Sequence, residues 1–244
     1  MATIVSELAP SGVLVAGINL GNPVIAQRDP DGGDPRGVGP DLARELARRA
    51  GVPIRFVTYE TAGLLADAVK QGAWDVAFLA IDPERANDIE FSAAYVHIEG
   101  AYLVPADSPL RSIEDVDRED VRIAVGRKTA YDLYLTRNVK HAQLVRCDSS
   151  QAAIDQFVAQ KLEAVAGVKQ PLAAHAQENT GLRMLAGSFM LIRQASGVPK
   201  GRPAARRYLA AFIEEAKASG LVARALAKSG LDGVSIAPPS HTPA

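Results

Sequence analysis

An acid and an arginine follow one of the chain's apolar runs at a spacing that could bind an anion. Asp82 and Arg85 come directly after the continuous apolar run at residues 76–81. Such a run is typical of a strand buried on both faces, and ligands of open α/β sheets bind outside the carboxyl ends of such strands. A guanidinium offers a planar fork of donors for two hydrogen bonds to a carboxylate. We expect Arg85 to bind an anion; the alternative is that it only pairs with neighbouring acids, Asp82, Glu84 or Asp88.

A second candidate anion site is the segment Gly-Arg-Lys-Thr at residues 126–129, which reads as a turn from a strand into a helix. Free backbone N–H groups and the helix dipole favour a carboxylate or phosphate at such a turn. Arg127, Lys128 and Thr129 are therefore candidate ligand contacts. The alternative is a turn that carries exposed basic side chains and binds nothing.

The elements that position these residues alternate along the first third of the chain. Apolar runs at residues 13–18, 54–58 and 76–81 predict strands. Pro40 begins one predicted helix, which Gly51 ends, and Thr61 caps another, which Gly72 ends. This β-α-β-α-β order predicts parallel strands with right-handed crossovers. The inward face of the second helix is expected to comprise Leu64, Leu65, Ala68 and Val69.

The same alternation restarts after Pro109. Strands are expected at residues 122–125, 143–145, 164–167 and 183–185, and helices at residues 129–137, 149–160 and 169–178. In the second of these helices the inward side chains are expected to be Ile154, Phe157 and Val158. Residues 101–104 and 189–194 are β-prone and predict two bridges, which make a hinged pair of lobes with a cleft between them. Two Ala-rich helices follow at residues 202–229, and residues 237–244 are expected to be disordered.

Composition excludes several classes of protein. The chain has 244 residues with a formal net charge of −1, which gives no electrostatic case for nucleic acid or an anionic membrane. Cys147 is the single cysteine, and the four histidines, His97, His141, His175 and His241, show no ligand spacing. We therefore expect no disulfide, no metal site and no cofactor.

The N-terminal residues bear on location. Residues 1–12 contain Glu7 but no Lys, no Arg and no apolar stretch of the length that a secretory signal needs, and no later run approaches a membrane span. The sequence as written predicts a cytoplasmic protein without a membrane span, or a periplasmic one if a leader has been trimmed.

The order of motifs resembles a known family. An apolar run that begins with Asp75 is followed by a short turn with Arg85, then by Phe-Ser-Ala-Ala-Tyr at residues 91–95 and Ser-Pro-Leu at residues 108–110. With Gly-Val-Gly-Pro-Asp-Leu-Ala at residues 37–43, this order is similar to the family-3 solute-binding proteins that deliver amino acids to ABC transporters, and the similarity covers nearly the whole chain. The resemblance implies an α/β fold of two Rossmann-like lobes joined by a two-strand hinge, the fold of type II periplasmic binding proteins. It places residues 1–104 and 195–244 in one lobe and residues 105–194 in the other.

The resemblance also assigns roles to residues. In the family, the Arg that matches Arg85 grips the ligand's carboxylate, and Thr129 matches a Thr at the second turn; the segment before Arg85 is shorter here and lacks the family's hydroxyl side chains. The acid that holds an α-ammonium in the family has no counterpart, because Val168 stands there and Lys169 and Gln170 follow. The remaining candidate ligand contacts lie near predicted strand ends and bridges: Asn19, Glu60, Asp82, Glu99, Tyr131 and Gln194.

Three interpretations of function stay open. The first is a solute-binding protein that captures a small carboxylate or amino-acid-like ligand in the inter-lobe cleft, with an ABC permease or a sensor as partner; the absent acid indicates a ligand without an α-amino group. The second is a cytosolic enzyme on the same fold, a lyase similar to cyclohexadienyl dehydratase. In that case Glu99, in its apolar setting, is the candidate proton donor, with Asp82 or Glu60 as its partner. The third is a homologue that binds no ligand.

Overall fold

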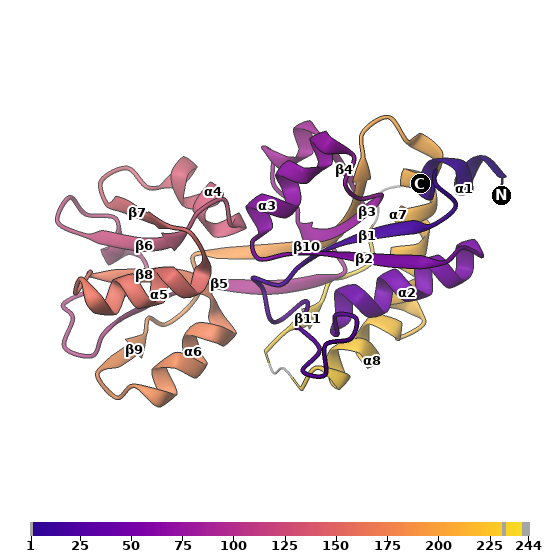
Figure 1. Ribbon diagram of the computed structural model, residues 1–244. Helices are drawn as coiled ribbons and strands as arrows, with labels where there is room; N and C mark the ends of the chain where they lie inside the picture. Colours follow the sequence, from indigo (N-terminus) through magenta and orange to yellow (C-terminus); the bar gives the residue numbers. More distant parts are fainter. Residues whose placement is uncertain (1, 231–232, 241–244) are drawn as a thin grey trace. The chain divides into compact units, whose positions relative to one another are not determined.

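The chain packs as two units, which the computed structural model describes over residues 2–230 and 233–240. The first unit comprises residues 1–97 and 193–244, and the second comprises residues 98–192. Strand β5 (Val96–Pro105) begins in the first unit and ends in the second, and β10 (Met190–Pro199) carries the chain back (Figure 1).

The first unit is built on a sheet in the order β2-β1-β3-β10, in which β1 runs parallel to β2 and β3 while β10 runs antiparallel to β3. This pairing confirms the predicted parallel β-α-β-α-β arrangement. Short strand β4 pairs with β10, and β11 pairs with the start of β5. The elements are α1 (Ala2–Leu8), β1 (Leu14–Asn19), α2 (Val38–Ala50), β2 (Ile54–Tyr59), α3 (Ala62–Asp67), the 3-10 helix η1 (Ala68–Gln71), β3 (Val76–Ala80), the 3-10 helix η2 (Arg85–Asn87), β4 (Ile89–Phe91), α7 (Pro203–Ala218), α8 (Leu221–Lys228) and β11 (Ser235–Ile236).

The ends of the helices follow the sequence signals. Thr61 caps α3, because its side chain accepts a hydrogen bond from the N–H of Leu64 at 3.2 Å. Gly51 ends α2 in the left-handed conformation that glycine adopts without a steric penalty. The expected inward face of α3 is wrong at Leu64, whose exposed fraction is 55%. The other three residues of the predicted stripe, Leu65 of α3 and Ala68 and Val69 of η1, are buried as expected.

The core of the first unit packs against the face of β1 and β3 around Trp74. The indole is fully buried, and its N–H donates to the carbonyl oxygen of Leu65 at 2.9 Å. Gly17 on β1 lies directly beneath, since a Cβ there would meet the Leu65 side chain at 2.6 Å. A side chain at that position would force the helix away from the strand.

Both ends of the described chain lie in the first unit. Helix α1, which the sequence did not predict, is fixed by Glu7, whose carboxylate accepts hydrogen bonds from the N–H groups of Ala204 and Ala205 at the start of α7. The expected disorder at residues 237–244 is wrong for the first four of them. Ala237 donates its N–H to Tyr95, and Lys217 donates to the carbonyl of Pro238. Residues 241–244 lie outside the described residues.

The second unit has the strand order β5-β8-β6-β7, and β9 pairs with the end of β5, at residues 103–105. Strands β6, β7 and β8 are parallel, and β5 is antiparallel to β8. Its elements are the 3-10 helix η3 (Glu114–Val116), β6 (Arg122–Gly126), α4 (Ala130–Asn138), β7 (Gln143–Cys147), α5 (Ser150–Ala159), β8 (Ala164–Val168), α6 (Lys169–Glu178) and β9 (Leu182–Met184).

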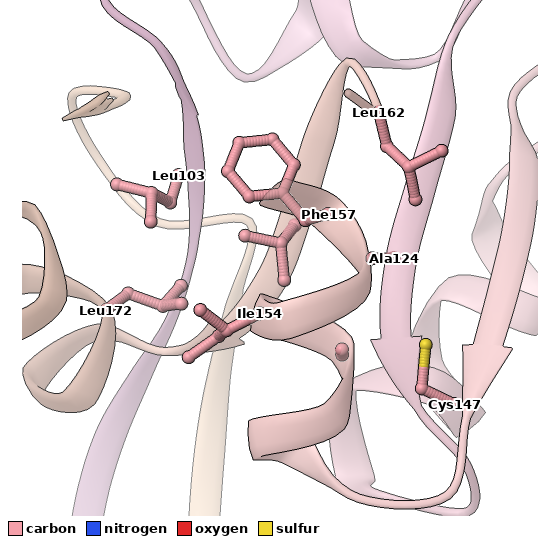
Figure 2. Close-up of a cluster of buried hydrophobic side chains, with 9 residues drawn as sticks. Leu103, Ala124, Cys147, Ile154, Phe157, Leu162 and Leu172 are labelled. Atoms are coloured by element: carbon pink, nitrogen blue, oxygen red, sulfur yellow. The ribbon is translucent and has the colours of Figure 1, made fainter. Parts of the chain in front are cut away.

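Helices α5 and α6 cover one face of this sheet and enclose its core. Figure 2 shows Ile154 and Phe157 of α5 beside Leu103 of β5 and Leu172 of α6. The prediction that Val158 also points inward is wrong, because 53% of it is exposed. It lines an open groove with Pro105, Lys161 and Leu182.

Candidate functional site

The carboxyl ends of the parallel strands form two edges, one in each unit, and the predicted site residues distribute between them. The unit 1 edge is defined here by residues at the end of β1 and after β2 and β3, together with the neighbouring position on β10: Asn19, Glu60, Asp82, Arg85 and Gln194. The unit 2 edge is defined by the residues that follow β6, β7 and β8, together with the neighbouring position on β5: Arg127, Lys128, Thr129, Tyr131, Asp148, Ser150, Lys169, Gln170 and Glu99.

Arg85 lies at the unit 1 edge, against the end of β3. Its guanidinium donates to the carbonyl oxygen of Ala80 at 2.9 Å, and only 6% of the residue is exposed. Burial lowers the pKa of Arg85 to about 10, while the carboxylates of Asp82, Glu84 and Asp67 act in the opposite direction. The structure therefore holds a buried cation among acids at the strand end where the sequence predicted an anion-binding arginine.

The other polar residues of this edge are also held by the protein. Asp82 is buried, and its carboxylate accepts a hydrogen bond from the N–H of Glu84 at 2.8 Å, which shapes the turn before η2. The buried Asn19 accepts from the N–H of Gly21 at 2.9 Å. Gln194 is buried on β10 opposite Ala80. Glu60 differs from these residues, because it is exposed and forms an ion pair with Arg28.

At the unit 2 edge, the protein itself uses the N–H groups of residues 127–129 in the turn between β6 and α4. Arg127 donates its N–H to Cys147, Thr129 donates its N–H to Gly126, and Lys128 donates its N–H to a carboxylate oxygen of Asp132 at 2.7 Å. A ligand at this turn would therefore find the N–H groups of these three residues already bonded, one of them to an acid of the protein. Asp132 also holds Lys128 in the left-handed backbone region, which is uncommon for a residue other than glycine.

Asp132 is a site residue that the sequence analysis missed. It is buried, its N–H donates to the Thr129 hydroxyl at 3.1 Å, and its carboxylate accepts from Arg146 at 2.9 Å. The signal was present, since Thr129 and Asp132 have the spacing of a capping box, in which the first and fourth residues satisfy each other's backbone donors. The hydroxyl of Thr129 is itself used, because it donates to the carbonyl of Gly126 at 2.8 Å.

Tyr131 ties this turn to the next one. Its hydroxyl lies 2.7 Å from the Ser150 hydroxyl in the first turn of α5, and burial raises the pKa of Tyr131. The structure thus gives Tyr131 a role in joining α4 to α5. Arg127, in contrast, is exposed, and its guanidinium forms no ion pair with any residue that the structure describes.

Glu99 and Lys169 meet at the carboxyl end of β8. Gly100 pairs with Val168 in the antiparallel register of β5 and β8, so Glu99 faces Lys169, and the two side chains form an ion pair. The exposed fractions are 38% for Glu99 and 44% for Lys169. The expected apolar setting for Glu99 is therefore wrong, because its carboxylate meets both an ammonium and solvent.

No group of three or more metal-ligating side chains occurs in the described part of the chain. Among the same residues, no helix is both long and apolar enough to cross a membrane.

Solved structures share the fold. A mutant of ArgBP from T. maritima superimposes with a TM-score of 0.77 at 24% identity, covering 94% of this chain and 99% of its own. The receptor for L-cysteine of Neisseria gonorrhoeae gives 0.78 at 22%, covering 93% and 92%. The ancestral amino-acid-binding protein AncCDT-1, described as a precursor of cyclohexadienyl dehydratase, gives 0.76 at 23%, covering 92% and 97%. No curated protein matches the sequence.

These likenesses define the class of protein as one with the type II periplasmic-binding-protein fold, which confirms the predicted fold. The model of one family, the bacterial extracellular solute-binding proteins, family 3, matches residues 14–231. The chain belongs to this family, as the order of its motifs indicated.

Proposed function

We propose that the protein captures a small organic carboxylate and that Arg85 is the carboxylate's partner. The observation that carries the proposal is the position of the Arg85 guanidinium at the carboxyl end of β3, fixed by its hydrogen bond to Ala80. A guanidinium held in place by burial loses little conformational entropy when it binds a planar anion. Membership of a solute-binding family supports the proposal, as do structural relatives described as binding amino acids.

Delivery of the ligand to an ABC permease or to a sensor is part of the proposal, and it rests on the resemblance alone. The predicted contacts at Asn19, Thr129, Gln170 and Gln194 also stay predictions. Catalysis by Glu99 gains no support from its exposed ion pair with Lys169, so the dehydratase-like alternative is not developed further.

The test is calorimetric binding of small carboxylates to the wild type and to Arg85→Lys. Lysine keeps the positive charge and loses the fork, so the variant should bind at least about tenfold more weakly, the equivalent of roughly 1.4 kcal/mol. Arg55→Lys is the matched control, because Arg55 lies exposed on β2 of the same unit and should leave affinity unchanged. Equal affinity of Arg85→Lys and the wild type would refute the assignment.

A thermal-shift screen identifies the ligands for that experiment. A ligand at a hundred times its dissociation constant should stabilise the protein by roughly 2.7 kcal/mol, which raises the unfolding midpoint measurably. Failure of every carboxylate and amino acid in the screen to raise it would leave the homologue that binds no ligand as the better interpretation.

A further inference from the structure

One acid and one base share the carboxyl end of β8. Glu99 precedes Gly100, which pairs with Val168 at the end of β8, and Lys169 follows Val168 as the first residue of α6, so the two side chains meet at the strand end and form an ion pair. Neither side chain is enclosed, since each keeps more than a third of its surface exposed. A ligand that reached this strand end could therefore contact either of them.

The surroundings of the pair are basic. Strand β6 is the other neighbour of β8, and it ends at Gly126, directly before the exposed Arg127 and Lys128. Asp148 follows β7, which lies on the far side of β6 from β8. Glu99 is thus an acid beside the end of β8 that a cationic ligand group could use, and the ammonium of Lys169 already neutralises it.

We propose that Lys169 is a specificity-determining residue. Its ammonium forms an ion pair with the Glu99 carboxylate and so excludes ligands with an α-ammonium group that would need the same carboxylate. The inference deepens the proposed function and rests on it. A tethered ammonium competes at a high effective concentration with the ammonium of any free ligand. A ligand that displaced Lys169 would leave two cations beside one carboxylate, and a like-charge contact of this kind is a common means of rejecting a wrong ligand.

The test compares Lys169→Met with the wild type on three matched pairs of ligands: L-glutamate and glutarate, L-leucine and isocaproate, and L-alanine and propionate. Methionine is close to lysine in length and lacks the charge. Calorimetry should show that the wild type prefers the amine-free member of any pair that it binds. In Lys169→Met, the ratio of the two affinities should move towards the amino acid by about tenfold or more.

Two further variants make the result specific. Lys169→Met combined with Glu99→Gln should lose the gain, because the carboxylate that accepts the ligand's ammonium is then absent. Lys140→Met, at another exposed lysine of the second unit, should keep the wild-type ratio. Lys169→Ala serves if the methionine variant folds poorly.

The outcomes separate this inference from the proposed function. Carboxylate binding by the wild type together with an unchanged ratio in Lys169→Met overturns the role of Lys169 and leaves the proposed function standing. A wild type that binds amino acids as tightly as their amine-free partners also overturns it. If neither protein binds any member of the three pairs, both proposals are overturned. If only Lys169→Met binds, and it binds amino acids, the role of Lys169 is supported and the proposal that the wild type captures a small carboxylate is overturned.

Discussion

The two edges hold their polar groups in different ways. At the unit 1 edge, Asn19, Asp82 and Arg85 are buried and bonded to nearby backbone, so their positions are set by the fold itself. At the unit 2 edge, Arg127 is exposed, and Lys169 meets Glu99 in a pair open to solvent. Under the proposed function, the first edge supplies a fixed anchor for the ligand, and the exposed charges of the second edge determine which ligand is accepted.

The largest expected difference in stability is between variants of one arginine from each edge, Arg85 and Arg127. Arg85→Ala removes a buried cation from beside the buried carboxylate of Asp82, while the two other neighbouring acids, Asp67 and Glu84, are exposed. The free energy of unfolding should fall by about 3 kcal/mol. Arg127→Ala removes an exposed side chain and should change it by less than about 0.5 kcal/mol. Urea unfolding at pH 7 measures both, and equal losses would contradict the distinction between the edges.

Asp132 belongs to the buried part of the turn before α4 in the second unit, and its removal should have the next largest effect. Asp132→Ala deprives the Lys128 N–H and the Arg146 guanidinium of their acceptor and opens the turn before α4. We expect a loss of about 2 kcal/mol, typical of a lost charged hydrogen bond and cap. Asp148→Ala, at an exposed acid two residues before α5, is the matched control and should change stability by less than about 0.5 kcal/mol. A tolerated Asp132→Ala would mean that the turn is held by Thr129 alone.

Local signals were sufficient to predict much of the fold. Thr61, Thr129 and Ser149 each cap the helix expected after them, because a cap depends on residues three positions apart. The position of Arg85 followed from a buried strand and a proline turn, which are also local features.

The partners of the charged groups could not be predicted from the sequence. Glu99 and Lys169 are seventy positions apart and meet only because β5 and β8 pair in one register, which no local pattern specifies. The burial of Arg85 and its hydrogen bond to Ala80 likewise depend on tertiary packing. Leu64 and Val158 were misplaced because a hydrophobic stripe indicates an inward face only where another element covers it.

The smallest expected effect on stability concerns two acids outside the edges, Glu45 in the first unit and Glu163 in the second. Hydrogen bonds from Arg48 and Arg49 lower the pKa of Glu45 on α2 to about 2, and Arg122 lowers the pKa of Glu163 in the second unit. A carboxylate whose pKa is lowered on folding stabilises the protein fully above its unfolded pKa, near 4.5, and that contribution is lost as the pH falls towards the folded value. Glu45→Gln should therefore lower the thermal midpoint at pH 7 by a few degrees at most, and the difference from the wild type should shrink between pH 4.5 and 2. Glu163→Gln should show the same direction of change, measured by circular dichroism from pH 7 downwards. A difference in thermal midpoint that stayed constant with pH would mean that the charges of these carboxylates do not contribute to stability in either unit.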